Sequence, residues 1–218
     1  MKKSLLVFSL FLITHYSFSQ VIKTVNIDSL ITVTLPAEYF EKDTLGQQTF
    51  TAKSTYGFMV VERIPNGQNS APLKKEKDLK KAFKDYVKEV MQVSSGNVLN
   101  ERDTTLGTLK AHLFTIKTED DNGDIQFREF LFLYTRYASY SFQYFYKDAQ
   151  SGLIGDEVKS FYSSIKLNPD LQSDDQYLPP TGKGITGGLK AWLYGGGFIV
   201  VLIIVFAIIS KRKRKKVA

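Results

Sequence analysis

The stretch TLKAHLFTIKTEDDNGDIQFREFLFLYTRYASYSFQYFYK, residues 108–147, decides the fold of this chain. It holds three runs of strand-forming residues, which are interrupted at DDNG (residues 120–123) and at residues 137–138. A fourth run, NVLNERDTTLG, comes directly before it and ends at residues 106–107. Strands joined by connections this short pair as antiparallel neighbours. The stretch therefore predicts an antiparallel meander of four strands.

The run FLFLY, residues 130–134, is apolar on both faces of its predicted strand. A sheet with one solvated face would alternate there, so we expect this sheet to be covered on both sides. A helix over 73–94 offers one cover, with apolar residues at helical spacing: Leu79, Phe83, Tyr86, Val87, Val90 and Met91. A helix over 151–166 offers the other, with the stripe Ile154, Val158, Phe161, Tyr162 and Ile165. The expected fold class is α+β, an antiparallel β-sheet meander with helices on both faces (an α/β/α sandwich).

Shorter strands are expected before the first helix. ITVTLP, residues 31–36, alternates branched and polar side chains, as a half-buried strand does. Residues 48–64 predict two strands that turn near residues 54–57. IPNGQNSAP, residues 64–72, is a loop by composition.

The expected elements follow one another in a definite order: a strand that ends in LP, a hairpin, one long helix, an antiparallel meander and a closing helix. The closing helix has the sequence GDEVKSFYSSIKL, residues 155–167. This order of elements resembles the PsbP-like α/β/α sandwich family. The resemblance covers residues 25–167 and rests on element order and on the ending of the closing helix. It implies a domain that binds other molecules or assists assembly, without shared enzymatic residues to carry over. A membrane tail is not part of the family pattern, so no particular partner is implied.

The first residues have the pattern of a secretory signal. MKK supplies a positive start, residues 5–13 form an apolar run of nine, and SFS places small residues before a cleavage site. We expect a signal peptide over 1–19, cleaved after Ser19 to leave Gln20 first, as in many exported bacterial proteins. The alternative is an uncleaved anchor, for which the apolar run is short.

The last residues predict a membrane span. Residues 192–209 carry no charge, and 18 helical residues extend ~27 Å against a hydrocarbon core of ~30 Å. Trp192 and Tyr194 stand where aromatic rings favour the lipid–water interface. The alternative, a buried core helix, would need apolar surroundings on all sides. We expect a flexible linker over 168–188 and a transmembrane helix over 189–210.

A basic tail over 211–218 follows the span, with Lys211, Arg212, Lys213, Arg214, Lys215 and Lys216. Positive flanks remain cytoplasmic, which predicts a single-pass type I protein of the bacterial inner membrane. The exported domain, residues 20–167, would then face the periplasm. A basic run can also bind nucleic acid, but next to a span the membrane interpretation is favoured.

Charge supports this interpretation. The chain has a net charge of +7, but eight of its 29 Lys and Arg residues lie at positions 2–3 and 211–216. The rest of the chain has 21 basic and 22 acidic residues, a net charge of −1, so no nucleic-acid partner is expected. The absence of Cys excludes thiolate metal sites and cysteine nucleophiles.

Few residues suggest chemistry. After signal cleavage His112 is the one remaining imidazole, and we expect it to be a packed or surface strand residue, with catalysis or binding as alternatives. Residues 118–129 partly match a calcium loop, but Thr118 stands where the first Asp belongs, so we expect a hairpin tip rather than a weak cation site. No catalytic, cofactor-binding or metal-binding residue is assigned, and no cofactor is expected.

Aromatic residues crowd the last predicted strand, where Tyr140, Phe142, Tyr144 and Tyr146 share one face. We expect them to form core beneath a helix, and a groove for a peptide or apolar ligand is the alternative. The resulting hypothesis is a membrane-tethered, non-enzymatic binding or assembly module, with another envelope protein or peptide as partner. The alternative is an envelope hydrolase that uses carboxylate or Ser/Lys chemistry.

Overall fold

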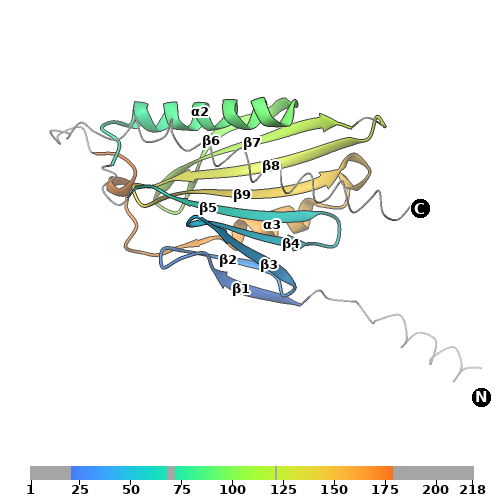
Figure 1. The fold of residues 1–218 in the computed structure, drawn as a ribbon, viewed down its shortest axis with the longest axis horizontal. Helices are drawn as coiled ribbons and strands as arrows, with labels where there is room; N and C mark the ends of the chain where they lie inside the picture. The colour runs from blue at the N-terminus through green and yellow to red at the C-terminus, as the bar shows by residue number, and fades with distance from the viewer. Residues whose placement is uncertain (1–20, 68–71, 121, 179–218) are drawn as a thin grey trace, which may run out of the picture.

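The computed structural model describes residues 21–67, 72–120 and 122–178. They form a seven-stranded antiparallel sheet in the order β3-β4-β5-β9-β8-β7-β6 and a three-stranded sheet in the order β1-β2-β10 (Figure 1). The large sheet consists of β3 (Tyr39–Thr44), β4 (Gln47–Lys53), β5 (Phe58–Pro65), β6 (Asn97–Leu106), β7 (Leu109–Glu119), β8 (Ile125–Tyr134) and β9 (Ala138–Lys147). The small sheet consists of β1 (Ile22–Asn26), β2 (Ile31–Pro36) and β10 (Lys166–Leu167).

The predicted meander is confirmed. Strands β6, β7, β8 and β9 are neighbours in chain order, and the β7–β8 register runs from Ala111↔Leu133 to Glu119↔Ile125. Phe130 and Phe132 pack in one hydrophobic cluster, whereas Leu131 and Leu133 pack in the other. Alternate residues of an apolar strand thus serve two different cores, as a sheet covered on both faces requires.

Helix α2 (Glu76–Ser94) covers one face of the large sheet, where its buried side chains meet phenylalanines of β7 and β8 (Figure 1). The helix begins at Glu76 rather than at residue 73, because Leu73 is held in a bridge with Tyr177. It ends where Ser95 adopts a left-handed conformation and donates its N–H to the carbonyl of Met91. Met91 was expected on the buried stripe, but its side chain is 40% exposed on the outer face.

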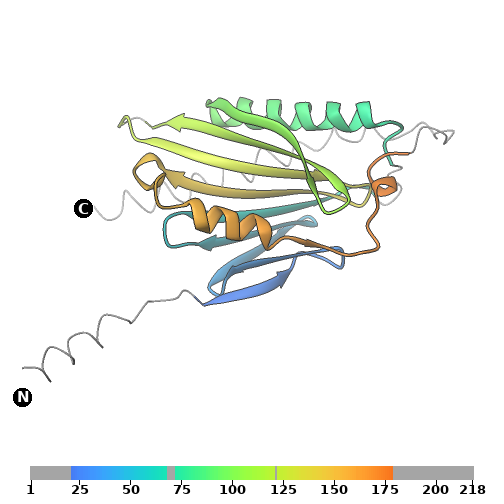
Figure 2. The ribbon, with the colours of Figure 1, turned by 180° about the vertical axis from the view of Figure 1, so that it is seen from behind.

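The opposite face differs from the simple α/β/α expectation. Helix α3 (Gly155–Ser163) shares this face with the small sheet, as Figure 2 shows. Strand β1 escaped prediction because only Val25 among its five residues is buried, and β10 is only two residues long. Helix α3 is also shorter than the expected 151–166, since its flanks form a 3-10 turn, η1 (Asp148–Gln150), and strand β10.

The aromatic face of β9 is core, as predicted, except that Tyr146 at its end is only partly buried. Tyr140, Phe142 and Tyr144 are fully buried against residues of the small sheet and Phe161 of α3. Their hydroxyls reach polar partners at the edge of this core: Tyr140 donates to Asp28 over 2.6 Å, and Tyr144 bonds Glu157. These contacts satisfy polar groups that would otherwise be costly to bury.

The domain extends further along the chain than the sequence indicates. Residues 168–178 were expected to begin a flexible linker, yet Leu171 is 2% exposed within the core and Gln176 is fully buried. The Gln176 side chain bonds the backbone N–H and C=O of Lys110 and the C=O of Tyr134, at 2.7 to 2.9 Å. The polar, Pro-containing composition of this segment predicts a linker. The segment is nevertheless part of the fold, because backbone and side-chain amide contacts hold it in place rather than an apolar stripe.

Several expectations concern residues outside the described ranges. They include the signal peptide 1–19, with Ser19 and Gln20, and linker residues 179–188. The same holds for the span 189–210, with Trp192 and Tyr194, and for the basic tail 211–218. Among the described residues no helix has the length and apolar character needed to cross a membrane.

Candidate functional site

The face of β9 that lies toward α2 carries a row of buried polar side chains. Ser139, Ser141 and Gln143 are 5%, 2% and 0% exposed, and Glu62 of the neighbouring strand β5 is 2% exposed. Glu62 pairs with Ser141 in the β5–β9 register. A covered face at the centre of a sheet is normally apolar, because each buried polar group must be compensated by hydrogen bonds. The row is therefore the candidate functional site of this domain.

Gln143 is the centre of this polar cluster. Its Nε2 donates to Glu62 Oε2 and to Ser141 Oγ, both over 2.8 Å. Tyr86 of α2 donates its hydroxyl to the same Ser141 Oγ over 2.7 Å. The Oε1 of Gln143 accepts from Nε and Nη2 of Arg128 on β8. One amide thus connects a buried carboxylate and a guanidinium that do not touch each other.

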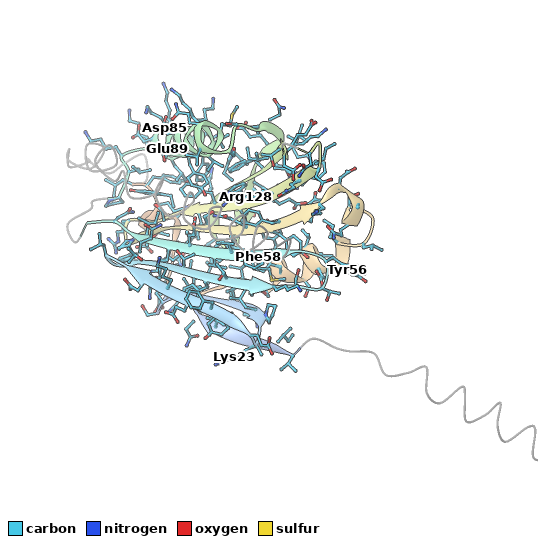
Figure 3. The ribbon with its side chains drawn as sticks, turned by 45° about the vertical axis from the view of Figure 1, so that its right-hand side comes forward. Lys23, Tyr56, Phe58, Asp85, Glu89 and Arg128 are labelled. Atoms are coloured by element: carbon cyan, nitrogen blue, oxygen red, sulfur yellow. The ribbon has the colours of Figure 1, made fainter. Side chains whose placement is uncertain are left out.

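Arg128 is held in a fixed orientation. Its guanidinium lies 4.1 Å from the ring centroid of Phe145 and 4.7 Å from that of Phe130. Figure 3 shows Arg128 on the sheet between α2, with Glu89, and the Phe58 end of β5. Phe145 in turn meets Phe58 edge-on, with centroids 6.5 Å apart. Within the described part of the chain no partner bonds Nη1 of Arg128, so one edge of the fork remains available.

Burial dominates the electrostatics of the cluster. It raises the pKa of Glu62 above the ordinary value of 4.5, while the charge of Arg128 and the bond from Gln143 act in the opposite direction. Burial also lowers the pKa of Arg128 to about 10, against the attraction of Glu62. The pKa of Tyr86 is raised, again mainly by burial. An acidic group that approached Arg128 would relieve the cost of burying this cation.

The oxygen of Ser141 is not arranged as a nucleophile. It accepts hydrogen bonds from both Tyr86 and Gln143, which occupies the two lone pairs that an attack would use. A serine nucleophile instead donates its own proton to a base. The cluster therefore has the chemistry of a recognition surface with one open cationic edge.

His112 is a packed strand residue, as predicted. It is 4% exposed and stacks on Phe83 of α2 with ring centroids 5.2 Å apart. Its Nδ1 lies 2.8 Å from Asp103 Oδ1 and its Nε2 3.2 Å from Glu101 Oε1. A bulge between Leu99 and Arg102 in β6 places both carboxylates beside the ring. Both ring nitrogens are thus engaged, a carboxylate clamp that the sequence did not reveal.

Asp120, Asn122 and Gly123 lie in the turn between β7 and β8, which confirms the predicted hairpin tip. Oδ1 of Asp120 accepts from the backbone N–H groups of Asn122 and Asp124, both over 3.0 Å. This arrangement is an Asx turn, in which the carboxylate serves the local backbone. Within the ranges that the structure describes, no group of three or more His, Cys, Asp or Glu residues could hold a metal ion.

The sequence predicted Tyr86 only as part of the buried stripe of α2 and assigned no cluster residue to a site, since every assigned position lies at the chain ends outside the described ranges. A signal was nevertheless present in SYSFQYF, where Ser139, Ser141 and Gln143 alternate with large aromatic residues. A second signal is Glu62, a charged residue that directly follows the apolar residues FMVV of β5 and is buried like them.

No family model matches the sequence, and no curated protein matches it. A crystal structure from Bacteroides thetaiotaomicron VPI-5482 is similar, with 11% identity and a TM-score of 0.41, over 64% of this chain and 46% of that one. The chain thus spans less than half of that protein. The solution structure of PsbP from the cyanobacterium Synechocystis sp. PCC 6803 is similar with 10% identity and a TM-score of 0.47, over 70% and 96%.

LpqN of Mycobacterium tuberculosis, a protein described as involved in cell envelope biogenesis, is similar with 8% identity and a TM-score of 0.43, over 68% of this chain and 91% of that one. A PsbP structure is therefore among those similar to this chain. All three TM-scores lie below 0.5, so these likenesses transfer no ligand, partner or activity.

Proposed function

We propose that this chain is a membrane-tethered, non-enzymatic binding or assembly module whose domain faces the periplasm. The signal pattern of residues 1–19 and the uncharged run 192–209 with its basic flank support this topology. Together they favour the bacterial inner membrane as the location. Another envelope protein or peptide is then the partner.

The observation that supports recognition is the state of Arg128. Two of its nitrogens bond Gln143, two rings enclose its plane, and Nη1 remains open among the described residues. A guanidinium held in this way presents a planar donor edge that matches a carboxylate. Little side-chain freedom is left to lose on binding, which favours affinity. We assign Arg128 as the anchor for an acidic side chain or C-terminal carboxylate of the partner.

An envelope hydrolase is the competing function. The feature in its favour is the buried carboxylate of Glu62, whose raised pKa resembles that of a general acid, near the hydroxyl of Ser141. The two hydrogen bonds that Ser141 Oγ accepts oppose a nucleophilic role. Binding through Arg128 accounts for the same residues without requiring a proton transfer.

Topology is tested first by proteolysis of spheroplasts. Protease added from outside should degrade the domain and leave an epitope fused to the C-terminal tail intact. Gln20 should be the N-terminal residue of the mature protein by mass spectrometry. Protection of the domain from added protease would overturn the periplasmic orientation.

Recognition is tested by cross-linking the full chain in its membranes and quantifying the captured proteins by mass spectrometry. Arg128→Ala should lose a specific envelope partner that the parent retains, and Arg128→Lys should recover it only in part because a lysine lacks the fork. Arg102→Ala is the matched control, since Arg102 is an exposed arginine on β6. If Arg128→Ala keeps every partner while folded, the assigned anchor is wrong.

A further inference from the structure

The outer face of α2 is covered by lysines. Between Leu73 and Val90 every residue in the exposed class is a lysine: Lys74, Lys75, Lys77, Lys80, Lys81, Lys84 and Lys88. The four acidic residues of the same segment are only partly exposed. A solvated helix face normally mixes both signs of charge. The exposed residues of this segment all carry positive charge, although the chain without its terminal basic segments is close to neutral.

These lysines form a continuous ridge, which we define as Lys77, Lys81, Lys84 and Lys88. At 3.6 residues per turn the four positions fall within an arc of about 60° on α2. Lys81 bonds Asp85 over 2.7 Å. Within the described ranges Lys77, Lys84 and Lys88 form no ion pair, so their charges face the solvent uncompensated.

The described chain leaves the domain beside the start of this ridge. Leu178 donates its N–H to the carbonyl of Leu73 over 2.7 Å, and Leu73 donates to Gln176 over 3.1 Å. From Leu178 to Leu189, where the proposed transmembrane helix begins, 11 residues can reach at most about 40 Å. The 19 residues of α2 extend only about 28 Å. The whole helix therefore lies within reach of the membrane surface to which the tether would lead.

We propose that the lysine ridge of α2 docks on anionic phospholipid headgroups of the membrane that the chain is proposed to span. This inference rests on the proposed tether, which keeps α2 near the bilayer, and adds an orientation to it. A lysine close to an anionic surface contributes about fivefold to partitioning, so removal of three lysines costs roughly a hundredfold. The docking is electrostatic and must weaken at high salt. When α2 docks in this way, the Arg128 site on the sheet beneath α2 faces along the membrane surface.

The natural absence of Cys allows a direct test in the full chain. Met91→Cys places a unique fluorophore on the same side of α2 as the ridge, at a position that is 40% exposed, without removing a lysine. Leu45→Cys, on the fully exposed β3–β4 turn at the other edge of the sheet, is the control position. Each labelled chain is reconstituted in vesicles of phosphatidylcholine alone or with 30 mol% phosphatidylglycerol. A small fraction of lipid carries a nitroxide headgroup, which quenches on contact.

The fluorophore at position 91 should be quenched several-fold more in the anionic vesicles, and 0.5 M NaCl should abolish the difference. The triple change Lys77→Glu, Lys84→Glu and Lys88→Glu should also abolish it. The matched triple change Lys42→Glu, Lys159→Glu and Lys166→Glu, at exposed positions on β3, α3 and β10, should leave it intact. The fluorophore at position 45 should not respond to lipid charge.

Two failures are distinguishable by vesicle flotation. A chain that floats with the vesicles but shows equal quenching at position 91 in both lipids overturns the docking alone. A chain in which the ridge triple change leaves the quenching intact does the same, because the approach to the anionic vesicles then does not require the ridge lysines. A chain that does not float with the vesicles overturns the proposed tether and this docking with it.

Discussion

Gln143 on β9 donates a hydrogen bond to Glu62 on β5, with 2.8 Å between Nε2 and Oε2, while its own carbonyl oxygen accepts from Arg128. The amide therefore stands between a buried carboxylate and a partly buried guanidinium and replaces a direct ion pair. A buried carboxylate with one neutral partner is still partly uncompensated, because desolvation penalises its charged form. This arrangement makes the stability of the domain depend on the protonation of Glu62.

Glu62→Gln should change the pH dependence of folding. Because the pKa of Glu62 is raised by burial above 4.5, the folded state binds more protons than the unfolded state once the pH exceeds that value. The parent thus loses stability as the pH rises from about 4.5 through the folded pKa. The variant lacks this loss, so it should gain relative to the parent as the pH rises. Urea unfolding of a fragment of residues 20–178 from pH 4 to 8 measures the difference, and a pH-independent difference would contradict the assignment.

Glu157→Gln should show the opposite sign. Burial alone would raise the pKa of Glu157, but bonds from Tyr144 and from the Thr55 and Tyr56 backbone outweigh it and lower the pKa. Its ionised form therefore stabilises the fold above pH 4.5, and this contribution is lost as the pH falls through the folded pKa. A urea series extended from pH 7 down to about pH 2 should show a cost for Glu157→Gln at pH 7 that disappears as the pH falls through the lowered pKa. A cost that grows on acidification would show that these bonds do not favour the charged form.

His112→Ala should destabilise the domain by about 1–3 kcal/mol, because it removes a buried ring together with two hydrogen bonds to carboxylates. Arg102→Ala, at an exposed position of the adjacent strand, should stay within ~0.5 kcal/mol. Partner capture by the folded His112→Ala chain should match the parent, since the ring lies outside the Gln143 cluster. Loss of a partner without loss of stability would make His112 a binding residue.

Local periodicity was sufficient for much of this fold. Strand-like runs in the sequence predicted β6 to β9. The run at residues 130–134, apolar on both faces, predicted that both faces of the sheet are covered. The stripe of α2 was correct except for Met91, which lies at its margin and turns outward. These patterns can be recognised in the sequence because the burial of side chains follows the period of the helix or strand that carries them.

Features that depend on distant contacts were missed. Strand β1 has one buried residue, so its alternation is invisible without β2 beside it. The polar row of β9 is understandable only once Glu62 and Arg128 lie next to Gln143, although they are 81 and 15 residues away along the chain. Hydrogen bonds between such residues leave no period in the sequence.

Gln176→Ala tests whether the segment after β10 belongs to the folded unit. The change removes three hydrogen bonds to the backbone of Lys110 and Tyr134 and should cost about 1–3 kcal/mol. Gln172→Ala is the matched control, since the Gln172 side chain is exposed and donates to the carbonyl of Pro169 within its own turn. A fragment that ends at residue 167 should likewise melt below one that ends at 178. Equal melting temperatures for these two fragments would return residues 168–178 to the linker.

Phe161→Ala tests the docking of α3 on the large sheet. Phe161 is 2% exposed, lies 6.3 Å from Tyr144 between ring centroids, and belongs to the core shared by β9 and the small sheet. Truncation of a buried phenylalanine costs ~3–5 kcal/mol, a large part of the ~5–15 kcal/mol that stabilises a domain. Urea unfolding of residues 20–178 should therefore show a loss of this size. Leu153→Ala, where the side chain is 57% exposed just before the same helix, should change stability by no more than ~0.5 kcal/mol. If both variants unfold like the parent, α3 does not contribute to the core and the second face of the sheet is covered by the small sheet alone.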